Sequence, residues 1–363
     1  MKIDFIIGSL GGGGAERVLA LIVNSLAKNR RYDISLITFY KGNEAYELTP
    51  NIKRVQLKSN KLIKNHTLNS MIYLLGHYKS KSQRPDLILS FSTSTNFITI
   101  LVAKFYSIKI IAQEHTSYLG YDKKRSSITT ITRKHLYRLA NLLTVLTYLD
   151  VPHYKKLGVE VYVMPNPCSF KPITENNHLR KKIILAAGNL NRYDGKGFDN
   201  LIRLMVPIFK NHPDWRLKIA GSGEEGLNHL TQLAKRAKVL DKVIFTGFID
   251  NISDVMNESS IFILSSKYEG LPMALLEAMS QGMACIAYNC LTGPSDIIEN
   301  NKNGLLIENQ NTEKMQQGLL KLIENEELRN KLSNEGIKSM DKFNIDVITE
   351  RYESLLNKLV YES

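Results

Sequence analysis

The sequence predicts an α/β protein built from two Rossmann-like domains, whose parallel sheets face a central cleft. Short apolar runs alternate with helical patterns along the chain, which is typical of parallel sheets covered by helices on both faces. A polar, proline-containing segment at 165–180 interrupts the alternation midway. The length of 363 residues suffices for two domains of ordinary size.

The first half contains six expected strands and a helix that follows the first of them. Each strand is a short apolar run, and the helix is expected over Ala15–Lys28. The strands are expected at Ile3–Ile7, Ile34–Phe39, Leu87–Phe91, Lys109–Gln113, Leu142–Leu146 and Val161–Met164.

The second half repeats this pattern and ends in a helical segment over Asn344–Val360. We expect an N-terminal domain over 1–168, a C-terminal domain over 181–342, and a last segment, 343–363, that packs back on the first domain, with packing on the second domain as the alternative. The strands of the second half are expected at Ile183–Ala187, Arg216–Ala220, Lys242–Thr246, Ile261–Ser265 and Ala284–Tyr288.

The composition excludes several classes of protein. A hydrophobic fraction of 43% excludes a disordered chain. Three cysteines cannot form a disulfide framework, so we expect a reducing compartment. Residues 1–168 hold 24 Lys and Arg against 10 Asp and Glu, whereas residues 169–363 hold 24 against 25. The basic excess of the first half indicates an anionic partner for that domain, with a solvated basic surface as the alternative.

We expect neither a signal peptide nor a spanning helix. The apolar start, Ile3–Leu10, is only one strand long and runs into glycines. The most apolar window, Phe97–Ala112, is interrupted by two lysines and is shorter than the roughly 20 residues that a spanning helix needs. A cytoplasmic protein is therefore expected, and a peripheral position on a membrane stays open.

Glycine-rich loops follow several expected strands. Gly11-Gly12-Gly13-Gly14 opens the first helix, where backbone N–H groups of Gly13 and Gly14 can approach a phosphate. A dinucleotide fingerprint needs a glycine near position 16, which is Glu16. A turn without ligand is the alternative. Gly221, in a similar loop after Arg216–Ala220, has the same two interpretations.

Two further loops offer charged or titratable groups. His115 follows the strand Lys109–Gln113 and can bind a sugar hydroxyl or move a proton, although a structural histidine is an equal alternative. Arg192 and Lys196, after Ile183–Ala187, can both face an anion. A solvated loop is the alternative there.

The segment 265–279 carries the most weight. Pro272 suits the start of a helix, which puts Glu269 before the helix and Glu277 inside it. Free N–H groups at the start of such a helix can hold a phosphate, while the carboxylates accept hydrogen bonds from sugar hydroxyls. The backbone that can hold the phosphate belongs to Gly270, Leu271, Met273 and Ala274. The sequence contains no Asp-x-Asp motif, so we expect no metal and no other cofactor.

The spacing of Glu269 and Glu277 resembles the Glu-x7-Glu motif of the family-four retaining glycosyltransferases of GT-B fold. Four other segments resemble motifs of that family in the same order, so the resemblance extends over most of the chain. They are Gly13–Arg17, Glu114-His115, Phe245–Phe248 and the stretch from Thr292-Gly293-Pro294 to Asn303–Leu306.

The resemblance implies a role for each motif residue. Glu277 would bind the ribose, Glu269 the donor sugar, and the segment ending at Phe248 the base. Arg192 and Lys196 would bind the diphosphate with help from backbone at Gly14, and His115 would contact the transferred sugar. The family usually has Arg directly after the glycine of this loop, where this chain has Asn189.

The resemblance implies a metal-independent, retaining transfer, by front-face attack through an oxocarbenium-like state. The donor would be a nucleotide-sugar, expected to be a UDP-hexose or UDP-N-acetylhexosamine. The acceptor would be an undecaprenyl-diphosphate-linked or other lipid-linked glycan in bacterial polysaccharide assembly, such as O antigen or lipopolysaccharide. A sugar-nucleotide epimerase of the same fold is one alternative. A nucleic-acid-binding protein is another, which the acidic pair disfavours; we therefore expect no nucleic-acid partner.

Two basic stretches of the first half can touch an anionic membrane, which would place the enzyme on the inner face of the cytoplasmic membrane. The first is apolar Leu62–Leu75, flanked by lysines. The second, from Lys123 to Arg138, is expected to form a basic amphipathic helix, in which Arg133 and Lys134 hold an acceptor diphosphate. Packing of both apolar faces on the core is the alternative. The flanking lysines of the first stretch are Lys58, Lys61, Lys64, Lys79 and Lys81.

Overall fold

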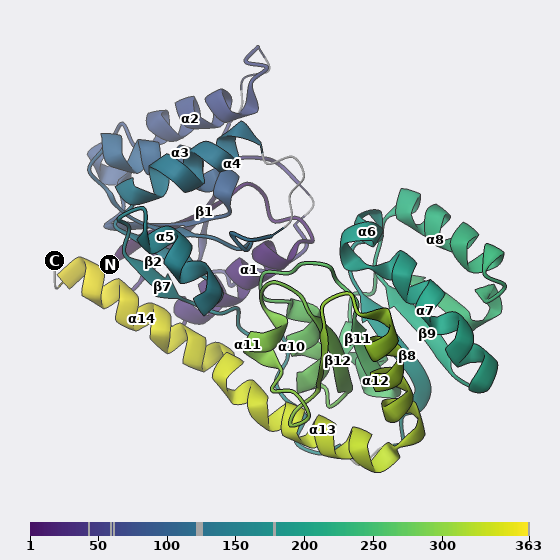
Figure 1. Ribbon diagram of the computed structural model, residues 1–363. Helices are drawn as coiled ribbons and strands as arrows, with labels where there is room; N and C mark the ends of the chain where they lie inside the picture. The colour runs from purple at the N-terminus through teal and green to yellow at the C-terminus, as the bar shows by residue number, and fades with distance from the viewer. Residues whose placement is uncertain (43, 59, 61, 121–125, 177–178, 362–363) are drawn as a thin grey trace. The chain divides into compact units, whose positions relative to one another are not determined.

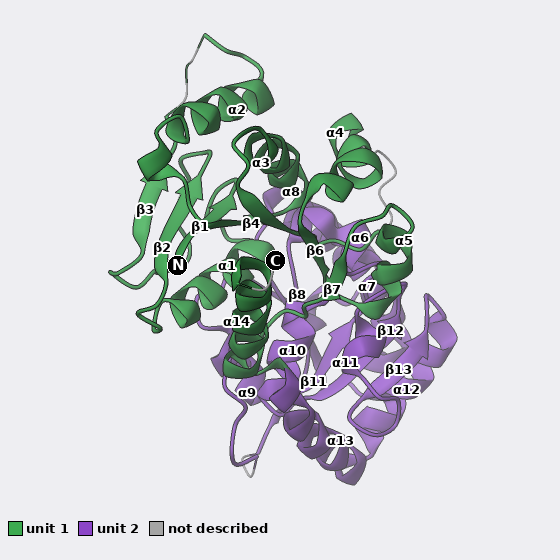
Figure 2. Ribbon diagram, turned by 90° about the vertical axis from the view of Figure 1, so that its left-hand side faces the viewer, with its two compact units in different colours: residues 1–169, 343–363 green, residues 170–342 purple. Residues whose placement is uncertain are grey.

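The computed structural model divides the chain into two compact units (Figures 1 and 2). Unit 1 comprises Met1–Ser169 and Phe343–Ser363, and unit 2 comprises Phe170–Lys342. Each unit is described by itself. The structure describes residues 1–42, 44–58, 60, 62–120, 126–176 and 179–361.

Unit 1 is built on a parallel sheet of seven described strands in the order β3-β2-β1-β4-β5-β6-β7. The order reverses between β1 and β4, which makes the switch point of a doubly wound sheet. The strands are β1 (Lys2–Ile7), β2 (Asp33–Thr38), β3 (Lys53–Gln56), β4 (Leu87–Phe91), β5 (Lys109–Gln113), β6 (Leu142–Val145) and β7 (Val161–Val163).

Helices cover both faces of this sheet (Figure 1). Helices α2, α3 and α4 lie over one face, and α1 and α14 pack together over the other. Their apolar sides are buried, as for Leu19 and Ile22 of α1 and Tyr352 of α14. The helices are α1 (Gly14–Leu26), α2 (His66–His77), α3 (Thr93–Phe105), α4 (Ser127–Ile131), α5 (Val151–Lys155) and α14 (Ile345–Tyr361).

Unit 2 is built on a second parallel sheet, of six described strands in the order β10-β9-β8-β11-β12-β13. Its core includes Trp215, the single tryptophan of the chain, which is 3% exposed. The strands are β8 (Lys181–Ala187), β9 (Arg216–Ala220), β10 (Val243–Gly247), β11 (Ser259–Leu264), β12 (Ala284–Asn289) and β13 (Leu305–Glu308).

Two helices of unit 2, α12 and α13, begin at asparagine caps. The side chains of Asn311 and Asn325 accept hydrogen bonds from the amides of Lys314 and Leu328, which satisfies N–H groups of the first turns. The helices are α6 (Tyr193–Lys196), α7 (Phe198–Asn211), α8 (Glu224–Arg236), α9 (Ile252–Glu258), α10 (Met273–Ser280), α11 (Pro294–Ile297), α12 (Thr312–Glu324) and α13 (Glu326–Lys338).

The expected α/β architecture of two parallel sheets is confirmed. Two strands were missed, β3 and β13, which lie at sheet edges and are only four residues long. The last helix packs on α1 and belongs to unit 1. The connections between the units are tied together within unit 1, because the Cys168 amide donates to the Phe343 carbonyl at 2.7 Å.

The basic stretch from Lys123 to Arg138 differs from the amphipathic helix that we expected. Residues 123–125 lie outside the described residues, as does Lys61 of the first stretch. The described part is one short helix, α4, followed by a π-helical turn, Thr132–Leu136. Lys134 is exposed, but Arg133 is only 5% exposed.

Candidate donor and acceptor sites

In unit 2, the loops that follow β8, β9 and β10 pack backbone against backbone. The Gly221 amide donates to the Gly247 carbonyl at 2.8 Å, and the Gly188 amide donates to the Ala220 carbonyl at 2.9 Å. A Cβ atom on Gly221 would lie 1.9 Å from the Gly188 carbonyl oxygen. Gly221 also has a φ of 144°, so only glycine fits here. The glycine loop brings the strand ends together at one edge of the sheet.

Lys196 and Glu269 form an ion pair at this edge. Lys196 Nζ lies 2.7 Å from Glu269 Oε1, which also accepts from Ser266 Oγ at 2.6 Å. The Lys196 side chain is 21% exposed and that of Glu269 is 11% exposed. The structure therefore brings together two residues, 73 positions apart, that were both predicted for the donor site.

Side-chain hydroxyl groups hold the backbone of both members of this pair. Ser265 Oγ donates to the Lys196 carbonyl at 2.8 Å, and Thr292 Oγ1 donates to the Glu269 carbonyl. Gly197 has a φ of 69°, and a Cβ atom there would lie 2.1 Å from the Ser265 carbonyl oxygen. Glycine at 197 therefore lets the end of α6 approach the end of β11.

Helix α10 begins directly after this pair. Pro272 precedes the first helical residue, and its carbonyl accepts from the Leu275 amide at 3.1 Å. Gly270, Met273 and Ala274 are half-buried, and Leu271 is buried. Glu277, the fifth residue of α10, is 3% exposed. The loop, the helix start and Glu277 thus follow one another as the sequence predicts.

Two other predicted donor-site residues lie apart from these contacts. Arg192 ends a short 3-10 turn, Leu190–Arg192, is exposed, and takes no part in the Lys196–Glu269 contacts given for the described residues. Phe248 directly follows β10 and is 59% exposed, so its ring is open to a ligand. Their roles stay predictions.

In unit 1, the glycine-rich loop Gly11–Gly14 is held by a hydrogen bond from Tyr46, and an acidic residue, Glu16, follows it. Helix α1 begins at Gly14, and Tyr46 OH donates to the Gly13 carbonyl at 3.0 Å. A Cβ atom on Gly13 would lie 2.1 Å from Glu16 Oε2. Burial raises the pKa of Glu16. Because this carboxylate lies in the first turn of α1, it competes with a phosphate for the positive helix start.

His115 is the second residue after β5. Its ring stacks on that of Phe91, with 4.9 Å between the ring centroids and an angle of 13° between the ring planes. Both ring nitrogens are buried, and Asn166 is a hydrogen-bonding neighbour of the ring. Burial lowers the pKa of His115 to about 4, although the Glu114 charge and the Asn166 side chain oppose this shift. The imidazole is therefore neutral near pH 7.

The carboxylate of Glu114, the residue before His115, is buried and fully surrounded by donors. Arg133 Nε lies 3.1 Å from Oε2, and Tyr137 OH donates to the same oxygen at 2.9 Å. Thr93 and Thr116 donate at 2.8 Å to Oε1. Burial alone would raise the pKa of Glu114, but Arg133 and these hydrogen bonds outweigh it and hold the pKa below its usual range.

This network corrects the expectation for Arg133. Its guanidinium points into unit 1, where it pairs with Glu114 and donates to Thr116 Oγ1 at 2.8 Å. It is therefore committed to the protein interior and does not present its charge to a diphosphate at the surface. Sequence inspection missed the role because Arg133 stands among surface cations, while its partner lies 19 residues earlier.

The described residues include no cluster of three or more His, Cys, Asp or Glu side chains arranged to hold a metal ion. Cys168, Cys285 and Cys290 are all buried, and none is joined in a disulfide.

Comparison with known proteins agrees with this arrangement. Residues 12–170 match the sequence model of Glycosyltransferase Family 4, and residues 171–339 match that of Glycosyl transferases group 1. The chain is 31% identical to an uncharacterized glycosyltransferase of Haemophilus influenzae over 98% of its own length and 99% of that protein's. Fold, site and relatives thus define a glycosyltransferase.

Among glycosyltransferases, the chain belongs to family four. A further relative is an alpha-1,4-N-acetyl-D-galactosaminyltransferase of Campylobacter jejuni, named for a glycan on PP-undecaprenol. It is 26% identical, over 98% of both chains.

Solved structures share the two-domain GT-B fold. Sucrose-phosphate synthase of Thermosynechococcus elongatus aligns with a TM-score of 0.85 at 16% identity, over 100% of both chains. HepE of Anabaena, solved with UDP and glucose, aligns with a TM-score of 0.82 at 15% identity, over 99% of this chain and 100% of its own. At these identities the likeness shows the fold alone.

Proposed function

We propose that the protein transfers a hexose or N-acetylhexosamine from a UDP-sugar, with retention, to an undecaprenyl-diphosphate-linked glycan in bacterial polysaccharide assembly. The observation that carries this proposal is the Lys196–Glu269 pair beside the start of α10. It joins a cation suited to a diphosphate with a carboxylate suited to sugar hydroxyls.

The chain's own residues supply the catalytic effects in this proposal. Lys196 stabilises the charge that develops on the leaving diphosphate, in a partly buried site where electrostatic interactions exceed their strength in water. Glu269 accepts hydrogen bonds from the donor sugar, and Glu277 accepts them from the ribose. Neutral His115 binds a hydroxyl of the transferred sugar. Attack comes from the face that the diphosphate leaves, without a metal.

The proposed donor follows the ligand of a protein of the same fold, and the proposed acceptor follows the name of a relative. HepE binds UDP in its solved structure, and the Campylobacter enzyme is named for an undecaprenyl-linked glycan. The related chain is matched over nearly its whole length, so the comparison includes both domains.

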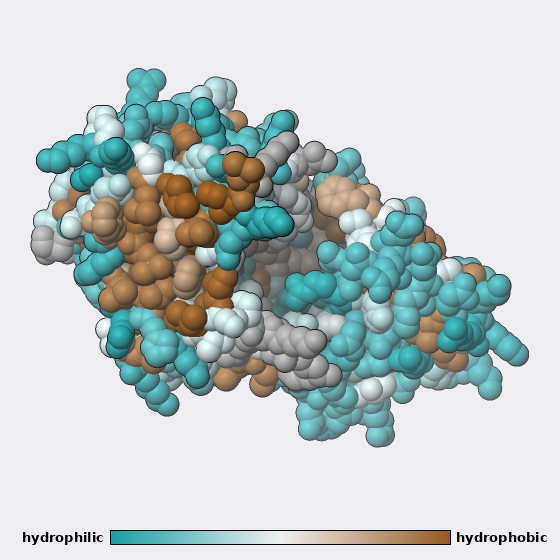
Figure 3. All heavy atoms as spheres, turned by 90° about the horizontal axis from the view of Figure 1, so that it is seen from above, coloured by the Kyte–Doolittle hydropathy of each residue, from teal (hydrophilic) through white to brown (hydrophobic). Residues whose placement is uncertain are grey.

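Unit 1 presents an apolar surface that favours a membrane position. Figure 3 shows apolar side chains gathered over the helices that lie uppermost in Figure 1. The exposed members include Leu68 and Ile72 of α2, Phe105 of α3 and Ile131 of α4. These helices pack side by side, α2 on α3 and α3 on α4. We name these four residues the helical apolar surface.

Cations accompany this surface. Residues 58–139 contain 14 Lys and Arg but only three Asp and Glu. Lys64, Lys104 and Lys134 are exposed. Each cation near an anionic bilayer contributes about 1 kcal/mol to binding. Among the described helices none is long and apolar enough to cross a bilayer. We therefore propose peripheral binding at the inner face of the cytoplasmic membrane.

Calorimetric titration with UDP, GDP and ADP in the presence of EDTA tests the donor site. We expect UDP to bind without metal, and Glu277→Ala and the milder Glu277→Gln to reduce its affinity at least tenfold. Glu327→Ala is the matched control, because Glu327 is an exposed acid of α13 in the same unit. UDP binding that needs a metal, or that survives both Glu277 variants, would contradict the proposed donor site.

Transfer to lipid-linked acceptors tests the reaction itself. We expect sugar to move from the UDP conjugate onto an undecaprenyl-diphosphate glycan, with the anomeric configuration kept. Release of an epimerised sugar without an acceptor would instead identify an epimerase.

Sedimentation with vesicles tests the membrane position. We expect binding to vesicles that contain anionic lipid and a loss of binding in a Leu68→Ser, Ile72→Ser variant. A Leu240→Ser variant is the control, because Leu240 is similarly exposed in unit 2. Equal binding to neutral and anionic vesicles would count against the electrostatic part.

A further inference from the structure

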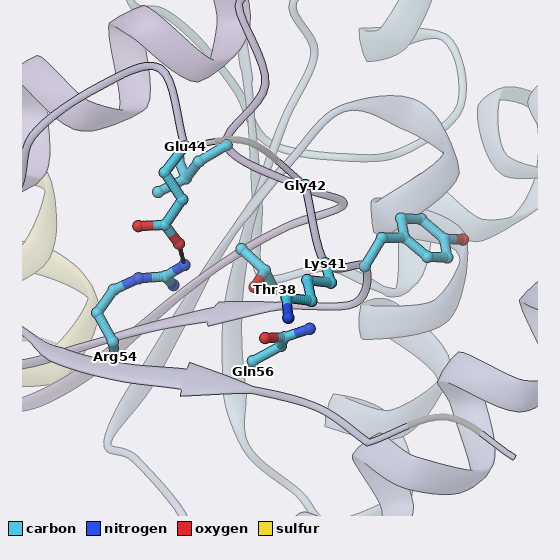
Figure 4. Close-up of a pocket in the computed structure, with 8 residues that line it drawn as sticks. Thr38, Lys41, Gly42, Glu44, Arg54 and Gln56 are labelled. Carbon is cyan, nitrogen blue, oxygen red and sulfur yellow. Dashed lines mark hydrogen bonds and ion pairs between the residues drawn. The ribbon is translucent and has the colours of Figure 1, made fainter.

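Unit 1 contains an open polar pocket that none of the predicted motifs includes (Figure 4). Its volume is about 190 Å³. It lies at the carboxyl ends of β2 and β3. The His115 loop follows β5, on the other side of β1 and β4 in the sheet. The pocket is lined by Thr38, Lys41, Glu44, Arg54 and Gln56, with Leu10 as an apolar member.

The backbone builds this pocket against the glycine loop. The Tyr40 amide donates to the Gly8 carbonyl at 2.9 Å, and the Ala45 amide donates to the Leu10 carbonyl at 3.0 Å. Tyr46 reaches further along the same loop and donates to the Gly13 carbonyl. The pocket is therefore a neighbour of the strand ends where the switch point of this sheet places ligands.

Its lining offers donors and acceptors on opposite walls. Thr38, Lys41 and Gln56 point toward one another on one side, and the Arg54–Glu44 ion pair stands on the other (Figure 4). Arg54 is also anchored through a hydrogen bond to the Leu36 carbonyl at 3.0 Å. Because Glu44 is half exposed, its pair with Arg54 is worth little to stability and can rearrange around a ligand.

Size and chemistry together indicate the ligand class. The pocket is smaller than the roughly 300–1,000 Å³ of sites for drug-sized molecules, so it suits a ligand of about one ring. A hydroxyl, an amide, an ammonium group and a carboxylate–guanidinium pair match the alternating donors and acceptors of a sugar ring.

We propose that this pocket binds a sugar unit of the acceptor glycan other than the one that is modified. The inference rests on the proposed function and deepens it: the acceptor class is an oligosaccharide of at least two units, held in unit 1 at the carboxyl ends of β2 and β3. The glycine loop that borders the pocket leads directly into α1.

Ligand-observed NMR titrations of the full chain test this proposal. The probes are methyl glycosides of glucose, galactose, N-acetylglucosamine and N-acetylgalactosamine, and the disaccharides built from them. We expect at least one disaccharide to bind more tightly than both of its single units. Lys41→Ala and Gln56→Ala should each weaken the binding of that disaccharide about three- to tenfold, as expected for the loss of one hydrogen bond.

Lys53→Ala is the matched control, because Lys53 is exposed at the other end of β3. Lys41 and Gln56 are exposed too, so their loss leaves the core intact. Unchanged disaccharide binding in both variants, or no disaccharide preference in the native chain, would overturn the inference. UDP titration of the same samples separates the failures: if UDP still binds through Glu277, only the pocket assignment is wrong.

Discussion

Unit 1 holds the Glu114–Arg133 ion pair and unit 2 holds Lys196–Glu269, and the two pairs differ in how fully their carboxylates are occupied. Glu114 accepts hydrogen bonds from five side chains, and both members are almost entirely buried. Glu269 accepts from two, and its partner Lys196 is partly exposed. A saturated pair has no capacity left for a ligand, whereas an open pair can exchange its partner for one.

The largest effect on stability is expected for a substitution at Arg133. We expect Arg133→Met to destabilise unit 1 by about 3–5 kcal/mol, because it leaves the buried Glu114 charge uncompensated. Chemical unfolding followed by far-UV circular dichroism measures this loss. Trp215 fluorescence reports unit 2 separately, since the single tryptophan lies there.

Two variants check that interpretation. Glu114→Gln combined with Arg133→Met should recover much of the lost stability, and Arg138→Met, at an exposed cation, should change little. A shift of the Trp215 transition as large as that of the dichroism would argue against an effect confined to unit 1.

The pH dependence of stability provides a second test, at His115 of unit 1. In the unfolded chain this imidazole binds a proton below about pH 6.5, but in unit 1 it stays neutral until about pH 4. Its contribution to stability therefore falls as the pH drops from about 6.5 to about 4. As the pH falls from 7 to 4, the free energy of unfolding of His115→Gln should rise by about 3 kcal/mol relative to that of the native chain.

Asp4 works in the opposite direction, because burial raises its pKa to about 6. It is present in both proteins, so the difference between the two unfolding curves removes it. A constant difference across this pH range would contradict a neutral buried imidazole.

The open pair is tested at Lys196. We expect Lys196→Ala to lower UDP affinity by about 10- to 100-fold, since a charge-assisted hydrogen bond contributes about 1.5–3 kcal/mol. The Trp215 unfolding transition should move by less than about 1 kcal/mol. Lys267→Ala is the control, because Lys267 pairs with Asp194 in the same region. Equal losses of affinity in both variants would show a general charge effect.

The smallest expected effect concerns single donors. Tyr137→Phe removes one of the five donors to Glu114 and should cost unit 1 about 1–2 kcal/mol by circular dichroism. Ser266→Ala removes a donor from Glu269 and should cost unit 2 less, because Glu269 keeps its ion pair with Lys196 and is less completely buried than Glu114. The reverse order would mean that the two carboxylates do not differ as described.

Buried strands were readily predicted from sequence. β4 and β5 begin and end where the apolar runs do, because central parallel strands are apolar on both faces. β3, with the sequence Lys-Arg-Val-Gln, has no such run, since an edge strand is partly solvated. The pocket beside it was missed for the same reason.

The contact between Lys196 and Glu269 was predictable in part, because each residue follows a strand that could be recognised, and parallel strands end at one edge of a sheet. Their roles in binding a donor stay predictions. The buried, paired position of Arg133 was not predicted. A buried arginine and a surface arginine look alike in sequence, and only the three-dimensional position of Glu114 turns this one inward.

The return of the chain to unit 1 sets an order of events during synthesis. Residues 170–342 leave the ribosome before α14, so unit 2 is complete while unit 1 still lacks a helix that covers one face of its sheet. In particular, Tyr352 of α14 donates a buried hydrogen bond to Gln113, two residues before His115. The last support beneath the histidine loop is therefore synthesised only after the whole of unit 2.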